Sequence, residues 1–467
     1  MSHDTSTFKC EVVVPDGSAQ LHDVISRWSD GGVDVPALVV RPQTESDIVD
    51  AITYAKQHGL RLIPANGGHA TFVPIDSKTL YLDMNNFNEV ALDSSAQVVR
   101  IGGGASVRHV VSTLTPKGFY TVWPNSNAVG YVGALLGGGS HSLNGVHGLM
   151  VDSVISFRLI TASGNLLTVS AASSGEELKL FHALRGAGPG LGVVVSVTMK
   201  AFRISDLNLT DDKVWLRTLV FPPTAIDAAA EAFEQLQPPS ARLLAVLLFV
   251  RSPPGSPNPG APIVMLNAVY HGPSSEAEAL ASPLFDARVL ANTVKAESRS
   301  IPIANVNDSF EPFNVHGGYK DCAQCFLKSL SRENIKAGYQ KWLEATGAHE
   351  DAKKSFCVIG CYNTEQLVRN GKAEGPNSSF FASRDRGISV LSFLWSESPA
   401  TRKALLDSSD SFVSELRRGA TDPPRSFQNA MRPGLDLHEV YGDAIPELKR
   451  VKGVWDPAGL FWSPYAG

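Results

Sequence analysis

The stretches Ile63-Pro-Ala-Asn-Gly-Gly-His-Ala70 and Val129-Gly-Tyr-Val-Gly-Ala-Leu-Leu-Gly-Gly-Gly139 decide how this chain is read. Both are glycine-rich loops, and the first carries a histidine, His69. Glycine lets the backbone approach a ligand closely, and successive backbone N–H groups in such turns bind anions. The two loops therefore predict the two sides of a slot for a phosphate-bearing cofactor, with His69 beside its reactive edge.

Composition places the chain among globular proteins with a large core. It has 467 residues, of which 43% are apolar and 19% charged, and a formal net charge of −5. This balance gives no basic footprint for nucleic acid or for an anionic membrane. No window reaches the roughly 18 uninterrupted apolar residues of a transmembrane helix, and the N-terminus lacks the apolar core of a signal peptide. We therefore expect a cytoplasmic protein.

Five cysteines raise the alternative of a zinc-stabilised module. Cys322 and Cys325 have C-x2-C spacing, and Cys357 and Cys361 have C-x3-C spacing. The second pair lies in an apolar, strand-like run, and Phe-Leu follows Cys325. Free cysteine behaves as a small buried hydrophobe. We therefore expect these cysteines in the core and no metal site.

Helix and strand signals alternate along the first part of the chain. Thr44 and Asp47 have capping-box spacing at the start of an apolar-striped helix. Residues 79–83, 98–101, 150–161, 166–169 and 191–202 are predicted to be strands, and residues 107–114 and 176–184 helices. Mixed elements with short connections indicate an α+β domain over residues 1–205.

Longer apolar strands and helices follow. Strands are predicted at 216–221, 243–250, 263–269 and 390–395, and helices at 225–235, 332–346 and 401–418. This pattern favours a second α+β domain over residues 206–414 with an antiparallel sheet covered by helices. Residues 415–467 end in Trp455-Asp-Pro-Ala-Gly-Leu-Phe461, and these apolar anchors predict that the segment packs back onto the first domain.

Taken together, the motifs resemble those of FAD-linked oxidases of the vanillyl-alcohol oxidase/PCMH superfamily, in particular its berberine-bridge-enzyme-like branch. Asn66-Gly-Gly-His-Ala70 is similar to that family's R-G-G-H-S loop. Leu135-Leu-Gly-Gly-Gly139, Asp152-Ser-Val154, Ala183-Leu-Arg-Gly186 and the C-terminal Tyr441-Gly442 and Asp456-Pro457 follow in the family's order. The resemblance implies a bilobed α+β fold, with a PCMH-type FAD-binding domain of two subdomains and a substrate domain.

The resemblance also assigns residues to the cofactor. Each glycine alone could merely form a turn, but as a set they are better explained as backbone donors around the pyrophosphate. The residues implied to bind FAD are Asn66, Gly67, Gly68, His69, Ala70, Ser126, Val129, Gly130, Gly133, Gly137, Gly138, Gly139, His141, Gly192, Val194 and Asn429.

Three of these residues carry particular expectations. The resemblance implies a covalent bond from the His69 imidazole to the 8α-methyl group of the flavin; the alternative is a capping or core histidine. Ser126 stands where bicovalent relatives have a cysteine, so we expect a single link. Val129 is the small residue that accompanies reaction with dioxygen in relatives, although packing beneath the cofactor would explain it equally well.

The catalytic groups are less clear from the sequence. Asn429 matches the asparagine of the family's Y-x-N motif, but the tyrosine of that motif is Phe427 here, so the usual phenolic base is absent. Tyr319 and Tyr362 are the better replacements. The predicted catalytic set is thus Tyr319, Tyr362, Asn429 and Val129.

The resemblance implies an oxidase in which hydride passes from a small secondary-metabolite substrate to flavin N5 and O2 re-oxidises the flavin to give H2O2, with ring closure as a coupled option. The alternatives are a flavin dehydrogenase, an alcohol or sugar oxidase, and, from another class, a non-redox cyclase or the zinc-stabilised binding module. The expected partners are the small-molecule substrate and O2, without nucleic acid or membrane, in a monomer or homodimer.

Overall fold

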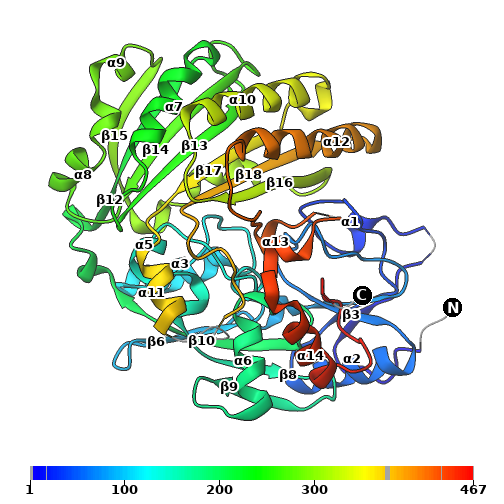
Figure 1. The fold of residues 1–467 in the computed structure, drawn as a ribbon. Helices are drawn as coiled ribbons and strands as arrows, with labels where there is room; N and C mark the ends of the chain where they lie inside the picture. The colour runs from blue at the N-terminus through cyan, green and yellow to red at the C-terminus, as the bar shows by residue number, and fades with distance from the viewer. Residues whose placement is uncertain (1–3, 17, 374–378, 433, 466–467) are drawn as a thin grey trace.

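The computed structural model describes residues 4–16, 18–373, 379–432 and 434–465, which form two lobes (Figure 1). The N-terminal lobe contains sheets of four, five and two strands, together with the C-terminal helices. The other lobe, here called the seven-stranded lobe, is one antiparallel sheet covered by helices on its outer face. This arrangement confirms the predicted bilobed α+β fold class.

The four-stranded sheet carries the first glycine loop at the end of a strand. Its order is β1-β2-β4-β3, with β1 (Glu11–Val13), β2 (Leu38–Arg41), β4 (Thr79–Asp83) and β3 (Arg61–Ala65). Strand β4 pairs in parallel with both β2 and β3. The loop after β3 therefore leaves the sheet at the carboxyl edge, where ligands of parallel sheets commonly bind.

Helix α2 (Glu45–Gln57) connects β2 to β3 and begins as its capping pattern predicts. The Thr44 hydroxyl accepts a hydrogen bond from the Asp47 N–H at 3.3 Å, and the Asp47 carboxylate accepts one from the Thr44 N–H at 2.8 Å. Ile48 and Ile52 on its apolar stripe are buried against the sheet. The helix thereby fixes the direction in which the chain enters β3.

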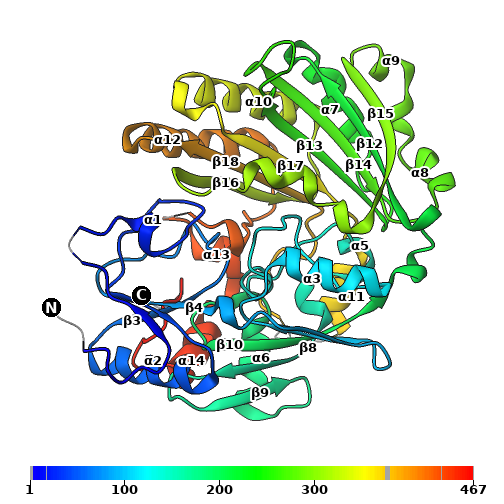
Figure 2. The ribbon, with the colours of Figure 1, turned by 180° about the vertical axis from the view of Figure 1, so that it is seen from behind.

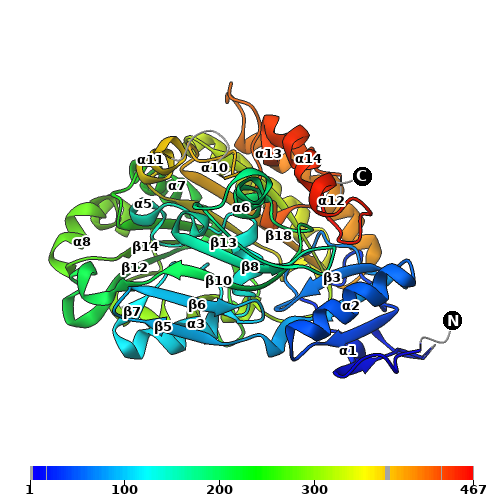
Figure 3. The ribbon, with the colours of Figure 1, turned by 90° about the horizontal axis from the view of Figure 1, so that it is seen from below.

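The five-stranded sheet is antiparallel and lies beside the four-stranded one (Figure 3). Its order is β5 (Val90–Asp93), β6 (Val98–Gly102), β10 (Val193–Lys200), β8 (Val154–Ile160) and β9 (Leu166–Ser170). Helices α3 (Val107–Leu114), α4 (Tyr131–Leu136) and α6 (Gly175–Ala187) pack with it, and β7 (Phe119–Tyr120) and β11 (Phe202–Arg203) form the two-stranded sheet.

One predicted strand in this sheet starts later than expected. Residues 150–153 form a 3-10 turn, and only residues from Val154 onward are extended. The buried Asp152 carboxylate accepts a hydrogen bond from the Leu149 N–H at 2.9 Å and pairs with Arg384 at 2.6 Å. An acidic side chain that caps its own turn competes with strand geometry.

The seven-stranded sheet joins its strands in the order β15-β12-β14-β13-β17-β18-β16. The strands are β12 (Lys213–Phe221), β13 (Leu243–Arg251), β14 (Pro262–Tyr270), β15 (Lys295–Pro302), β16 (Tyr319–Leu327), β17 (Phe356–Cys361) and β18 (Ile388–Ser396). Helices α7 (Ile226–Gln235), α10 (Arg332–Gly347) and α12 (Pro399–Leu416) cover one face (Figure 2).

The two faces of this sheet belong to different cores. On β13, Leu243, Leu247 and Phe249 pack with the covering helices. Leu244 and Leu248, which alternate with them, belong to the core shared with the N-terminal lobe. Because successive strand residues point to opposite faces, the helix-free face of the sheet closes onto the N-terminal lobe.

The C-terminal segment returns to the N-terminal lobe as helices α13 (Leu437–Tyr441) and α14 (Ile445–Trp455) (Figure 1). The buried Lys452 ammonium donates to Gly190 O and Phe461 O, each at 2.7 Å, and pairs with Asp456 at 2.5 Å. The Leu62 N–H of β3 donates to Leu460 O at 2.9 Å. The chain end thus helps to hold two segments beside the first glycine loop.

The cysteines lie on strands of the seven-stranded sheet, apart from the half-buried Cys10. Cys322 and Cys325 on β16 and Cys357 and Cys361 on β17 are buried free thiols. Within the described ranges, no group of three or more His, Cys, Asp or Glu side chains is arranged to bind a metal ion. The same described residues include no helix that is both long and apolar enough to cross a membrane.

Candidate cofactor site

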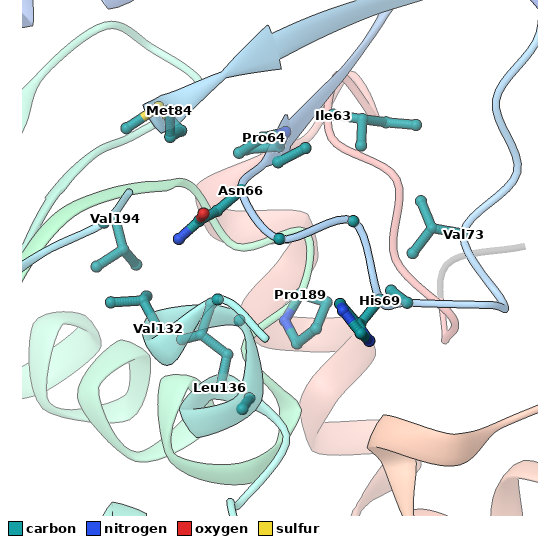
Figure 4. A pocket seen from close by; sticks show the side chains of 18 of the residues that line it. Ile63, Pro64, Asn66, His69, Val73, Met84, Val132, Leu136, Pro189 and Val194 are labelled. Carbon is teal, nitrogen blue, oxygen red and sulfur yellow. The ribbon is translucent and has the colours of Figure 1, made fainter. Parts of the chain in front are cut away.

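A cavity of about 250 Å³ lies between the two glycine loops (Figure 4). Both loops, the turn between α6 and β10, and the C-terminal segment contribute to its wall. The lining residues are Arg27, residues 62–70, Phe72, Val73, Met84, Gly103, Val129, Gly130, Val132, Gly133, Ala134, Leu136, Gly188, Pro189, Gly190, Gly192, Val194, Asn429 and Trp462.

The first loop faces the cavity along its whole length, from Ala65 to Ala70. Two of its residues have no room for a side chain on the outer side. A Cβ atom at Gly67 would lie 2.6 Å from Gly130 N and 2.7 Å from Ala128 O. A Cβ atom at Gly68, whose φ is +69°, would lie 2.5 Å from Ser26 O. The first loop therefore crosses the second in direct backbone contact.

The second loop faces the cavity only with its N-terminal part, from Val129 to Leu136. Gly133 on α4 is the open position, since a Cβ atom there would meet no protein atom within 4 Å. Val132 and Leu136 give the wall beside it an apolar surface (Figure 4). This part of the second loop leaves space for a ligand.

Asn429 reaches the same wall from the segment before α13. Its amide donates to Ala134 O at 2.7 Å and lies against Gly137. A side chain at Gly137 would overlap with this amide, so that glycine serves the packing of Asn429. Asn429 is thus fixed at the cavity edge by α4.

His69 projects into the cavity from the first loop (Figure 4). Its ring stacks on Trp28, with centroids 5.4 Å apart and planes 16° from parallel, and meets His316 edge-on at 5.7 Å. Its Nε2 is buried without a hydrogen-bond partner in the described part of the chain. A buried polar atom without a partner is costly, and His69 lines the cavity, so this nitrogen is a candidate for a bond to a ligand.

Burial lowers the pKa of the His69 imidazole to about 3, and electrostatic interactions with His316, Arg27 and Lys320 act in the same direction. His69 is therefore neutral throughout the physiological pH range. A neutral imidazole keeps the nitrogen lone pair that a nucleophile needs.

The predicted cofactor residues divide into two groups. Those that line the cavity are Asn66, Gly67, Gly68, His69, Ala70, Val129, Gly130, Gly133, Gly192, Val194 and Asn429. Gly137, Gly138 and Gly139 do not line it: side chains there would meet Asn429, Phe381 and Met150 respectively. These three glycines form the turn after α4 and allow close packing instead.

Ser126 and His141 also lie away from the cavity lining. The Ser126 hydroxyl donates to the Asn314 side chain at 3.0 Å, which connects it to the seven-stranded lobe. His141 is buried, and its Nδ1 accepts a hydrogen bond from the Leu143 N–H at 3.1 Å. His141 therefore supports the course of the loop after Gly139.

The structure does not bring the two candidate tyrosines to the cavity. Tyr319 lies at the start of β16 with the Arg402 guanidinium 5.6 Å from its ring, on the face covered by α12. Tyr362 is buried in the core between the lobes, and its hydroxyl has no partner among the described residues. Burial raises the pKa of Tyr362 far above its ordinary value, so its phenol stays protonated. Neither tyrosine is placed as a base here.

Sequence reasoning missed several residues around His69. Arg27 and Trp462 line the cavity, and Trp28 supports the imidazole, although none lies in a glycine motif. Arg27 is 3% exposed and donates to Ala70 O. The sequence signal that could have pointed to them is an arginine next to a tryptophan, Arg27-Trp28, in the N-terminal segment.

Comparison with known proteins supports the cofactor reading of this site. Residues 36–170 match the FAD binding domain family. The chain is 28% identical over 459 residues to the FAD-linked oxidoreductase hasG of Aspergillus fumigatus. The alignment covers 96% of this chain and 95% of hasG.

Solved structures share the fold. BBE-like 1 of Physcomitrella patens superimposes with a TM-score of 0.79 at 18% identity, over 98% of this chain and 96% of that one. A glucooligosaccharide oxidase of Acremonium strictum, described with 6-S-cysteinyl, 8α-N1-histidyl FAD, superimposes with a TM-score of 0.75 at 16% identity, over 97% and 96%. Residues 36–170 thus match an FAD binding domain, the chain as a whole is similar to FAD-linked oxidoreductases, and its fold is that of the berberine-bridge-enzyme-like oxidases.

Proposed function

We propose that this protein is an oxidase that carries FAD attached through His69, oxidises a small and largely apolar organic molecule, and delivers the electrons to dioxygen, giving H2O2. FAD supplies the redox chemistry when bound, because its N5 position accepts a hydride and its reduced form reacts with O2. The observation that carries the proposal is the buried, unpartnered Nε2 of His69, a residue that lines the cavity between the glycine loops.

The cavity wall suits FAD. All residues of the first loop from Ala65 to Ala70 line the space, and a glycine-rich loop in this position can offer backbone N–H groups to a diphosphate. Gly133 leaves room that any larger residue would fill, and Val132 and Leu136 offer an apolar surface to a flat ring. Gly103 and Val194 close the end farther along the five-stranded sheet.

A single covalent link fits the residues near the second loop. The glucooligosaccharide oxidase of similar fold has both a cysteinyl and a histidyl bond to its flavin. Here the position expected for the cysteine is Ser126, whose hydroxyl is bonded to Asn314. A serine hydroxyl in that state is a poor nucleophile beside a neutral imidazole, so His69 is the attachment point we propose.

An apolar substrate is supported by the face that the seven-stranded lobe turns toward the N-terminal lobe. Phe393 lies edge-on to Trp28, with ring centroids 5.6 Å apart, and packs on Phe356 at 4.8 Å. Phe313 continues the row, 4.0 Å from Phe356. Aromatic rings bind flat apolar molecules well. Together with the family relationship, this row supports a secondary-metabolite substrate.

Reaction with O2 can be tested without knowing the substrate. The holoenzyme is photoreduced under argon and mixed with oxygenated buffer, and flavin absorbance reports the re-oxidation rate. The proposal expects fast re-oxidation that yields one H2O2 per flavin. Val129→Leu, which adds bulk to the cavity wall, should slow re-oxidation by about tenfold or more. Re-oxidation of the wild type no faster than that of free flavin would contradict oxidase function and favour a dehydrogenase.

A further inference from the structure

The segment Ser26–Asp30, here called the clamp segment, lies between the first glycine loop and the seven-stranded lobe. On the loop side, the Trp28 N–H donates to Gly68 O at 3.1 Å, and the Trp28 ring stacks on His69. Arg27 donates to Ala70 O. The clamp segment thus contacts the backbone on both sides of His69 as well as its imidazole.

The other side of the clamp segment contacts the chain that leads into β16. The Trp28 indole donates to Phe313 O at 2.8 Å. The Gly318 N–H donates to the Asp30 carboxylate at 2.9 Å, and Ser26 and His316 side chains are hydrogen-bonded at 2.6 Å. The seven-stranded lobe therefore reaches His69 through the clamp segment.

Lys320 is the buried cation at the centre of these contacts. Its side chain is fully buried, and its ammonium donates to Trp28 O at 2.6 Å and to Gly317 O. The ammonium also lies 5.1 Å from the Trp28 ring centroid and 4.0 Å from that of Trp395. Desolvation makes such cation–π contacts stronger than those at the surface.

The backbone of Lys320 is fixed as well. The Ser29 hydroxyl accepts a hydrogen bond from the Lys320 N–H at 2.8 Å and donates to Lys320 O at 2.9 Å. Lys320 is thereby held by two neighbouring residues of the clamp segment, Trp28 and Ser29. Burying a charge has a desolvation penalty, and only partners in a fixed geometry offset that penalty.

We propose that Lys320 is a positioning residue for flavin attachment: it holds the Trp28 ring flat against the His69 imidazole and thereby orients His69 toward the flavin. This inference rests on the proposed covalent link. Lys320 takes part in no bond change itself. It acts from the seven-stranded lobe, so attachment depends on the two lobes having closed on each other.

The test compares covalently bound flavin with total flavin at a fixed early time after FAD is mixed with the apoprotein. Lys320→Met should slow attachment by roughly tenfold, as expected for loss of a desolvated cation–π contact, and lower the covalent fraction at that time accordingly, while total FAD stays near one per chain. Lys320→Arg, which keeps the cation over the rings, should recover most of it. A merely structural role would lower total FAD and thermal stability and leave the covalent fraction unchanged, which would overturn the proposal.

Lys354→Met is the matched control. Lys354 also places its ammonium over Trp395, at 5.1 Å, but its side chain is 61% exposed and is paired with Glu397. Its removal takes a cation from the same tryptophan without touching Trp28, and should leave the covalent fraction as in the wild type. An equal loss in Lys354→Met and Lys320→Met would contradict the proposal.

Crystal structures of the wild type and Lys320→Met test whether Lys320 orients the Trp28 and His69 rings, independently of whether the covalent link forms. The proposal expects the Trp28 and His69 rings to be parallel in the wild type and displaced in the variant; parallel rings in both would overturn it. A wild type without covalent flavin would refute the proposed link, and the rings would then decide whether Lys320 positions His69. If Lys320→Met does not fold, Trp28→Leu replaces it, and an unchanged covalent fraction there would also overturn the proposal.

Discussion

The two glycine loops look alike in sequence but differ in how much of each loop lines the cavity. In the first loop, every residue from Ala65 to Ala70 lines the cavity. In the second, the cavity wall ends at Leu136, and Gly138 and Gly139 pack against Phe381 and Met150. In both loops most glycines allow protein segments to approach each other closely, as Gly67 does at Gly130. Gly133 of the second loop is the position at which a glycine leaves open space for a ligand.

The largest effect is expected from Gly67→Ala in a His69→Ala background, in which FAD binding is reversible. The new methyl group would collide with backbone atoms of Ala128 and Gly130, which have no side-chain freedom to yield. Such overpacking costs about 1–3 kcal/mol of folding free energy and separates the crossing loops. We expect no measurable FAD binding by flavin fluorescence titration. Wild-type affinity in this variant would show that the loops need not cross as described.

Gly133→Ala in the same background should weaken FAD binding without weakening the apoprotein. A methyl group there meets no protein atom, so the unfolding temperature of the apoprotein should stay the same. Because the methyl group occupies ligand space, we expect the dissociation constant to rise about tenfold. An unchanged constant would place FAD away from α4.

Gly138→Ala should have the opposite profile. Gly138 has φ +105° and lies against Phe381, so a side chain is strained there and costs about 1–3 kcal/mol of stability. Since Gly138 does not line the cavity, the FAD dissociation constant should change less than twofold. Denaturant unfolding and the fluorescence titration measure the two effects. If Gly138→Ala lost FAD affinity but kept wild-type stability, Gly138 would belong to the cofactor site, as its motif predicts.

The smallest effect concerns pH. The pKa of His69 is lowered to about 3, so its imidazole remains neutral from pH 7 down to pH 5. The rate of covalent attachment, followed after FAD is mixed with apoprotein, should therefore be flat over this range. A histidine with the ordinary pKa near 6.5 would be about thirtyfold less reactive at pH 5 than when fully neutral. A fall of that size would show that His69 is not buried in this way.

Much of the fold could be predicted because its signals are local. The Thr44–Asp47 capping box and the helix at Val107–Leu114 follow from neighbouring residues and were found where expected. Strands β15 and β16 were not predicted. Strand β15 is a largely exposed, polar edge strand, and β16 contains Lys320, Asp321 and Gln324, whose burial depends on partners elsewhere in the chain.

In the site, too, the residues that form a local motif could be predicted, and those that meet only in the fold could not. His69 and the glycines around it form a motif within one loop, so their grouping is visible in the sequence. The role of Gly137–Gly139 was not, because it depends on Asn429, Phe381 and Met150, which pack on them in the fold. Arg27 and Trp28 lie far from His69 in the sequence, and Lys320 reaches Trp28 only when the lobes meet, so no local pattern contains these contacts.

The most direct measurement of the central claim is acid denaturation of the purified protein. The precipitate and the supernatant are then assayed for flavin absorbance and fluorescence, with His69→Ala as the control. We predict that flavin stays with the wild-type polypeptide and is released from His69→Ala, which still binds FAD before denaturation. Flavin released completely from the wild type would contradict covalent attachment through His69.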